Sequence, residues 1–193
     1  MEPKIFLAIP NMGWLHSQLV VNIIPWMRDW NVTLFAPNGL RPIPYARNFC
    51  VKAFLESGCT HLWFVDADTV PGSDALGLLL SAKVAAISGI VRQMKVDTDG
   101  TQVPVGIVVR KNDQHQYKEA VGSGVERIDA CGSGCILLSR EVFDRIPFPW
   151  YEERVWGDVR GSDFILGEKL EQVGIPLYAH FGVQCLHRKE VDF

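Results

Sequence analysis

Short apolar runs alternate with longer amphipathic segments through the first half of the chain. The apolar runs cover residues 4–9, 32–36, 61–65 and 84–91. The segments between them have the apolar spacing of helices and cover residues 15–30, 45–57 and 73–83. Strands that alternate with helices in this way are usually buried on both faces. The pattern therefore predicts an α/β fold with a mostly parallel central sheet and helices on both faces.

The second half of the chain is less regular. Residues 97–129 are polar and punctuated by glycine, which predicts a small antiparallel portion with short strands such as 103–109. Further on, the pattern predicts strands at 135–138, 177–181 and 183–186 and helices at 139–146 and 163–173. No repeat, low-complexity tract or linker interrupts residues 1–193, so we expect a single domain.

Composition excludes several classes of protein. The chain is 48% hydrophobic and 21% charged, as globular domains are, and unlike disordered, coiled-coil or collagen-like chains. Its net charge of −3 gives no electrostatic sign of a nucleic-acid or anionic membrane partner. The five cysteines are irregularly spaced and lack the paired spacing of a zinc site, which favours reduced thiols. Without a signal-peptide pattern or an apolar stretch of about 20 residues, we expect a cytoplasmic protein with no membrane span.

Two aspartates directly follow the apolar run 61–65, in the sequence Asp66-Ala67-Asp68. Ligands of open α/β sheets bind beyond the carboxyl ends of the strands, so both carboxylates emerge where a site is expected. Two acidic side chains this close can both reach a Mg²⁺ or Mn²⁺ ion, which prefers oxygen ligands. The alternative is a structural role at a helix start, because Pro71 and Ser73 follow closely.

The second half of the chain offers further polar candidates. His187 ends the last expected strand and could complete a metal shell, or be a terminal side chain without function. Asp163 opens a helix, where a carboxylate acts as a cap or as a general base. The Gly132-Ser133-Gly134 segment allows close backbone approach, either to a ligand or to a neighbouring strand.

Taken in order, these motifs resemble the GT-A fold glycosyltransferases, especially family-2-like members. The segment ARNFCVKAFLESGCTHLWFVDADTVPGSDAL is similar to their nucleotide-sugar half, in which an Arg-Asn helix precedes a strand ending in DxD. CGSGCILLSREVFDRI is similar to the acceptor-side strand and helix, and GSDFILGEKLEQVGIPLYAHFGVQCLH to an acidic helix with strands that end in His. The resemblance implies one Rossmann-like GT-A domain. Residues 1–95 would form its nucleotide-sugar-binding half and residues 96–193 its acceptor-side half.

The resemblance also implies roles for individual residues. The nucleotide sugar would be bound by Pro10, Asn11, Arg47, Asp66, Ala67 and Asp68. Mn²⁺ or Mg²⁺ would be bound by Asp66, Asp68 and His187, and the acceptor side would include Gly132, Ser133, Gly134 and Trp156. Asp163 would be the general base of an inverting enzyme. The family often has Glu-Asp there, whereas this chain has Ser162-Asp163, so the role rests on one carboxylate.

The implied activity is transfer of a sugar from a UDP- or GDP-linked donor to an acceptor hydroxyl. The sequence specifies neither the acceptor nor the oligomeric state, and the charge of −3 disfavours a nucleic-acid acceptor without ruling one out. The aromatic side chains Trp150, Tyr151 and Trp156 would form a lid or sugar platform, or simply pack.

Three other interpretations compete with this one. In a HAD-type phosphatase Asp66 and Asp68 would be nucleophile and acid/base, and Gly157-Asp158 would be part of a metal motif. That first motif normally lies near the N-terminus, whereas two strand–helix units precede it here. A sugar-nucleotide pyrophosphorylase needs a Gly-rich basic loop, which AIPNMGWLHS lacks. A non-catalytic nucleotide- or glycan-binding domain would have no need of a base at Asp163.

Overall fold

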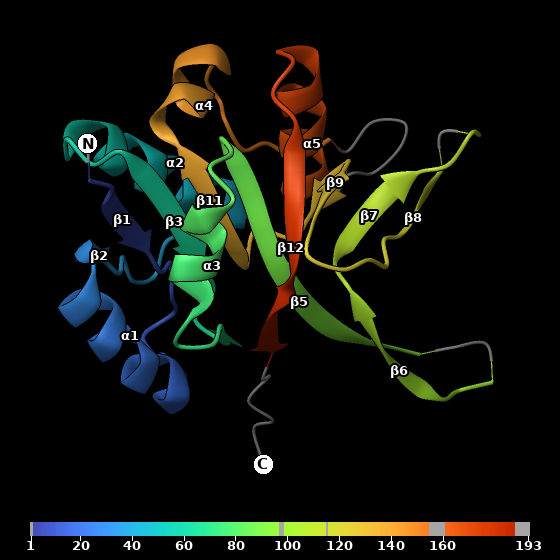
Figure 1. Cartoon of the computed structure of the whole chain (residues 1–193), viewed down its shortest axis with the longest axis horizontal. Coiled ribbons are helices and arrows are strands. Elements are labelled where there is room, and N and C mark those ends of the chain that lie inside the picture. Colours follow the sequence, from blue (N-terminus) through green and yellow to red (C-terminus); the bar gives the residue numbers. More distant parts are fainter. Residues whose placement is uncertain (1, 97–98, 115, 155–160, 188–193) are drawn as a thin grey trace.

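The computed structural model describes residues 2–96, 99–114, 116–154 and 161–187 (Figure 1). The helices are α1 (Ser17–Asp29), α2 (Ile43–Glu56), α3 (Ala75–Ser81), α4 (Arg140–Arg145) and α5 (Ser162–Gln172). The strands of the first half are β1 (Lys4–Ala8), β2 (Asn31–Phe35), β3 (His61–Val65), β4 (Thr69–Val70) and β5 (Ala86–Val96). Those that follow are β6 (Gln102–Gly106), β7 (Val108–Lys111), β8 (Tyr117–Glu119), β9 (Val125–Ile128), β10 (Ala130–Cys131), β11 (Cys135–Ser139) and β12 (Leu177–His187).

The central sheet has the strand order β2-β1-β3-β11-β5-β12-β4. β1 pairs in parallel with β2 and β3, and β12 pairs in parallel with β5. Between these two groups β11 runs antiparallel to both of its neighbours, β3 and β5. Five of these seven strands therefore run in the same direction, whereas the central β11 and the two-residue edge strand β4 are reversed. The sheet is mainly parallel, and the fold class predicted from the sequence is confirmed.

Antiparallel strands form the smaller part of the fold. β6 pairs with β5, β9 pairs with β12, and β10, β7 and β8 form a separate three-stranded sheet. Figure 1 shows β7 and β8 beside the central sheet, on the side of β12. The polar and glycine-rich composition of this part of the chain predicted such short strands.

Helices cover both faces of the central sheet. The core on one face joins apolar side chains of β1, β3 and β11 to those of α2, α4 and α5. The core on the other face joins the alternate side chains of the same strands to α1 and α3. In α1, for example, the buried side chains are Leu19, Ile23 and Trp26, which share one helix face. The strands β1, β3 and β11 thus bury both of their faces, as their apolar runs predicted. The run at 32–36 differs, because it forms the edge strand β2, in which Leu34 is 38% exposed.

The C-terminal part differs from the prediction of two strands. Residues 177–187 form one strand, β12, whose register against β5 shifts between Ala179 and Gln184. A Cβ atom at Gly89 of β5 would lie 2.8 Å from Val183 Cγ1, so the missing side chain lets β12 run close to β5 at the irregularity. The sequence also gave no sign of β4, whose two residues pair with Leu186 and His187.

All five cysteines are buried and unpaired. In the described part of the chain, no helix combines the length and the apolar character needed to cross a membrane.

Candidate functional site

Several polar segments meet where β3 ends. Asp66 follows the last residue of β3, and its backbone N–H donates to the carbonyl of Gly134, at 3.0 Å. Because β11 is antiparallel to β3, with Cys135 opposite Val65, the segment that precedes β11 lies beside the segment that follows β3. The reversed strand therefore brings the glycine-rich segment 132–134 to the two aspartates.

A buried arginine joins this cluster from α2. Arg47 is only 4% exposed, and its Nη2 lies 3.1 and 3.3 Å from the two carboxylate oxygens of Asp66. Its Nη1 donates to the carbonyl of Ser133 at 3.2 Å. The guanidinium also lies over the rings of Phe64 and Tyr151, at 5.4 and 5.7 Å from their centroids. A buried charge needs such partners, because the cost of removing it from water is several kcal/mol.

Asp163 reaches the same arginine from α5. Ser133 Oγ donates to Asp163 Oδ1 at 2.6 Å, and Arg47 Nε lies 3.9 Å from that oxygen. Gly161 is the N-cap residue of α5, so Asp163 lies in the first helical turn and its carboxylate faces the cluster rather than capping the helix. A carboxylate in a first helical turn is stabilised by the helix dipole.

Burial and charge both act on the ionisation of this cluster. Burial alone would lower the pKa of Arg47, but Asp66 and Asp163 outweigh it and hold that pKa above its ordinary value. Burial raises the pKa of Asp66, with smaller contributions in the same direction from Asp163 and Asp68, while Arg47 opposes the shift. Asp163 and Asp68 are thus close enough to influence Asp66, and Arg47 is the cation that Asp66 and Asp163 share.

The second aspartate pairs with the end of β12. His187 Nε2 lies 3.1 Å from Asp68 Oδ2, although the two residues are 119 positions apart in the sequence. The short strand β4 makes this contact possible, because Thr69 pairs with His187 in the sheet. Both side chains keep some exposure to solvent, 27% for Asp68 and 16% for His187.

Asp68 and His187 are suitable ligands for a divalent cation, whereas Asp66 is turned toward Arg47. A carboxylate and an imidazole suit Mn²⁺ well, and such ions often complete their shell with water and substrate phosphates. Among the described residues, no group of three or more His, Cys, Asp or Glu side chains is arranged to hold a metal ion. The donor chemistry therefore fits a partial metal site of two protein ligands. Binding of metal by Asp66 stays a prediction from the sequence.

The glycine-rich segment approaches protein atoms closely. A Cβ atom at Gly134 would lie 3.0 Å from Asp66 Oδ2 and 3.3 Å from Thr69 Oγ1. A Cβ atom at Gly132 would lie 3.2 Å from Ile107. Gly134 thus leaves room for the aspartate itself. The hydroxyl of Thr69 is also buried, and it has no hydrogen-bond partner among the described residues. Sequence reasoning did not single out this polar group.

Pro10 and Asn11 lie where β1 and β2 end. The Asn11 side chain donates to the carbonyls of Ala36 and Pro37, at 3.3 and 3.1 Å, so it joins the two strand ends. A backbone bond from His16 N–H to the carbonyl of Ala67, at 2.9 Å, ties the following loop to the two aspartates. The structure thus places Asn11 and Ala67 at the same edge of the sheet.

The neighbour of Arg47 has a separate structural role. Asn48 Oδ1 accepts from the backbone N–H groups of Trp150 and Tyr151, both at 3.0 Å, and its Nδ2 donates to the carbonyl of Tyr151 at 2.7 Å. Tyr151 is 1% exposed and packs against Phe64, so its ring supports Arg47. Trp156 and Gly157-Asp158 lie outside the described residues.

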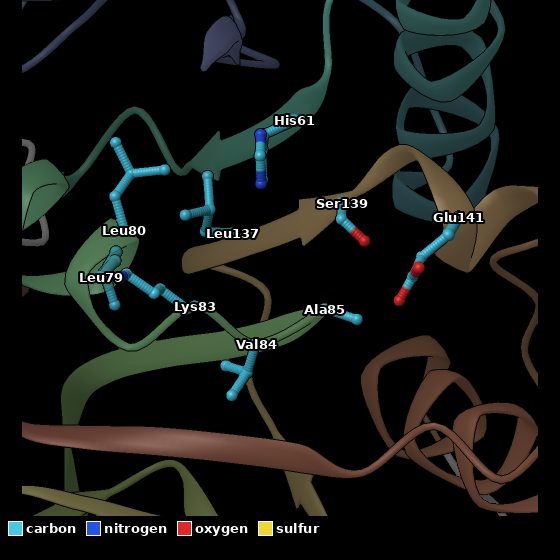
Figure 2. Close-up of a pocket in the computed structure, with 9 residues that line it drawn as sticks. All are labelled: His61, Leu79, Leu80, Lys83, Val84, Ala85, Leu137, Ser139 and Glu141. Atoms are coloured by element: carbon cyan, nitrogen blue, oxygen red, sulfur yellow. The ribbon is translucent and has the colours of Figure 1, made fainter. Parts of the chain in front are cut away.

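A separate pocket of about 260 Å³ lies at the other end of the sheet. Figure 2 shows its side chains coming from the start of β3, the second half of β11, the end of α3 with the segment that follows it, and the start of α4. His61 and Ser139 line it, but none of the predicted site residues does. Burial lowers the pKa of His61.

No protein-family model matches the sequence, and no curated protein matches it. The chain does superimpose on solved structures: A197 from STIV gives a TM-score of 0.66 at 17% identity, covering 97% of this chain and 86% of that one. GalNAc-T7 with UDP, GalNAc and Mn²⁺ gives 0.63 at 14% identity, covering 99% and 45%. TarS residues 1–349 from S. aureus, in complex with UDP-GlcNAc, gives 0.53 at 10% identity, covering 97% and 60%.

The chain has a GT-A-like fold. At these identities the likeness shows the fold alone, and the chain spans only about half the length of the GalNAc-T7 and TarS chains. The fold is not restricted to glycosyltransferases, since the inositol-1-phosphate CTP transferase from T. maritima shares it, with a TM-score of 0.52 at 10% identity. A functional assignment therefore has to rest on the side chains of the site.

Proposed function

We propose that the chain is a metal-dependent glycosyltransferase that moves a sugar from a nucleoside-diphosphate donor to an acceptor hydroxyl. The observation that carries this proposal is the convergence of three carboxylates, one imidazole and a buried arginine at the carboxyl edge of a GT-A-like sheet. They come from α2, the segment after β3, α5 and the end of β12. Burying charged groups costs desolvation free energy, and the packing of the core does not require these charges, so their grouping indicates a functional site.

The two ends of the cluster would divide the work. Asp68 and His187 would hold Mn²⁺ or Mg²⁺, an ion that would neutralise charge on the departing nucleoside diphosphate. The donor would be UDP- or GDP-linked, and the UDP of the GalNAc-T7 structure and the UDP-GlcNAc of the TarS structure make UDP conjugates the first to test. Pro10, Asn11 and the Asp66-Ala67 segment share that edge of the sheet and would contact the nucleoside.

Asp163 would act as the general base. Its Oδ1 accepts a hydrogen bond from the hydroxyl of Ser133. Its Oδ2 has no hydrogen-bond partner among the residues that the structure describes, so Oδ2 would take the proton of an acceptor hydroxyl. The acceptor oxygen would attack the anomeric carbon as the bond between that carbon and the diphosphate breaks. The electron pair of the broken bond would leave with the diphosphate. The guanidinium of Arg47 lies on the Oδ1 side of this carboxylate, with Nε 3.9 Å away, and would help to orient it.

A thermal-shift panel with Asp68→Asn tests the proposal. UDP, GDP and their sugar conjugates are each added with Mn²⁺ or with EDTA, because a ligand that binds only the native state raises the melting temperature. We expect stabilisation by one nucleotide family that requires Mn²⁺ and is lost in Asp68→Asn. Asp144→Asn, an exposed aspartate on α4, is the matched control.

The same panel distinguishes the competing functions. Stabilisation by Mg²⁺ with beryllofluoride, in the absence of any nucleotide response, would favour a phosphatase instead. If the panel shows metal-dependent nucleotide binding, a product assay with the donor then looks for transfer to sugar acceptors or to water, and the absence of both would favour a binding domain. Loss of the nucleotide response in Asp144→Asn as well as Asp68→Asn would remove the assignment of the metal to Asp68.

A further inference from the structure

An aromatic groove of about 800 Å³ lies on the outer side of α2, apart from the proposed reaction centre. Tyr45 and Phe49 of α2 form one wall, and Phe148 and Trp150 from the segment after α4 form the other. Its volume is in the range of small-molecule sites, about 300–1,000 Å³. We call these four side chains and the space between them the α2 groove.

The walls of the α2 groove are exposed aromatic rings. Tyr45 is 53% exposed, Phe49 42% and Phe148 71%. Aromatic side chains gain the most from leaving water, so three exposed rings around one hollow mark a contact surface. No other described part of the chain covers these three rings.

The rings are also held in place. Phe49 stacks on Phe35, with centroids 6.0 Å apart, and Trp150 lies edge-on to Phe148 at 5.3 Å. The Asn48 side chain fixes the backbone of Trp150 through the hydrogen bond to its N–H. A ligand would therefore meet a wall that is already ordered, which lowers the entropic cost of binding.

Two side chains of opposite charge also line the α2 groove. Lys52 and Glu56 lie one turn apart on α2, and neither forms a hydrogen bond or ion pair with any residue that the structure describes. Their charges cancel, so the groove favours neither an anion nor a cation. Their unpaired polar groups remain available to a ligand with hydroxyl groups.

We propose that the α2 groove binds a neutral oligosaccharide. Sugar rings present apolar C–H faces that pack on aromatic rings, and hydroxyl edges that hydrogen-bond to groups such as Lys52 and Glu56. A nucleotide would need a cluster of cations, and a wholly apolar peptide face would leave both charges buried without partners. Only in naming this ligand as the acceptor does the inference rest on the proposed function. If the ligand is the acceptor, one part of the glycan would lie at Asp163 and another part in the α2 groove.

Binding of oligosaccharides tests the proposal directly. The probes are cellohexaose, maltohexaose, mannohexaose and chitohexaose, each added to the full chain in EDTA without nucleotide. Binding is followed by saturation-transfer NMR and by the change in tryptophan fluorescence. We expect at least one of them to bind, and Phe148→Ala and Tyr45→Ala each to weaken it about tenfold, which corresponds to about 1.4 kcal/mol.

Controls keep the outcome specific to the α2 groove. Both substituted side chains are largely exposed, and unchanged melting temperatures would show that the variants fold. Ile24→Ala on α1, where Ile24 is 65% exposed, should leave the affinity unchanged. The proposal is overturned if no probe binds at millimolar concentration, or if binding is equal in all variants. Self-association that Phe148→Ala abolishes would overturn it too, because a second copy would then fill the groove.

The test separates this inference from the proposed function. Oligosaccharide binding that is sensitive to Phe148→Ala supports the α2 groove even if no nucleotide stabilises the protein. Conversely, Mn²⁺-dependent nucleotide binding without any oligosaccharide binding removes the groove proposal and leaves the transferase proposal intact.

Discussion

Replacing Arg47 with methionine should destabilise the protein strongly. Methionine keeps the length and the apolar stem of the side chain but removes the charge that faces Asp66 and Asp163. Loss of one partner from a buried ion pair costs about 3–5 kcal/mol. The Asp66 side chain is 36% exposed, so water compensates part of its loss. We therefore expect a cost of about 3 kcal/mol, the lower end of that range.

Urea unfolding followed by tryptophan fluorescence measures this cost. For a chain of this size, about 3 kcal/mol corresponds to a fall of about 6–12 °C in melting temperature. A double-mutant cycle with Asp66→Asn isolates the pair, because the double variant no longer holds an unpaired carboxylate at position 66. We expect the double variant to be at least about 1 kcal/mol more stable than the sum of the single effects.

An exposed pair provides the control. Arg28 and Asp29 are 2.6 Å apart, yet their side chains are 72% and 48% exposed, so Arg28→Met should have no measurable effect. The reasoning is refuted if Arg47→Met costs less than about 1 kcal/mol, or if its effect and that of Asp66→Asn simply add.

Three further predictions concern the site and its surroundings. Asp163→Asn should slow sugar transfer about 10²–10⁴-fold while the nucleotide-induced thermal shift is kept; equal loss of both would contradict a base. Gly134→Ala should cost about 1–3 kcal/mol in urea unfolding, because its Cβ atom would lie 3.0 Å from Asp66 Oδ2. Gly161→Ala is the control and should not lower the free energy of unfolding by this amount, because no atom lies within 4 Å of its added Cβ atom. Burial lowers the pKa of His61 from 6.5, so the folded state resists its protonation and stability falls as pH drops below that value. His61→Gln should flatten the melting temperature between about pH 7.5 and 5.5, and an unchanged pH profile would exclude this contribution.

Much of the central sheet is predictable because its strands are short apolar runs. The run at residues 61–65 becomes β3 with the same bounds. Five mostly apolar residues between polar segments are too few for a helix and are typical of a buried strand. The helix at 163–173 likewise lies within one residue of α5, with Gly174 directly after it in a left-handed conformation, at φ +68°.

Strand direction and register are less accessible to sequence reasoning. Nothing in residues 135–139 tells that β11 runs against β3, because the direction of a strand depends on the path of the chain between the strands. The irregularity of β12 depends on Gly89 in another strand, and β4 is only two residues long. These non-local features nevertheless decide that His187 meets Asp68.

The sequence identified the charged residues of the site more readily than their grouping. The roles of Arg47 at the nucleotide and of Ser133 on the acceptor side stay predictions. What the sequence did not indicate is that both residues belong to one hydrogen-bond network with Asp66 and Asp163. A signal for this was present in α2. Arg47 lies among the buried residues Ala46, Cys50, Val51 and Phe54, and an arginine on the buried side of a helix requires a carboxylate partner.

The paired residues Arg47 and Asn48 connect the two halves of the proposed enzyme. Successive side chains of a helix point about 100° apart, so Arg47 faces the carboxylates while Asn48 faces the segment at 150–151. One turn of α2 therefore contacts Asp66 and Asp163, which we propose for the donor and acceptor sides, and also holds the wall of the α2 groove. Because all three depend on the same turn, a shift of α2 would disturb donor binding, proton transfer and glycan binding together. Substitutions that move the helix should thus be distinguishable from Phe148→Ala, which changes only the groove.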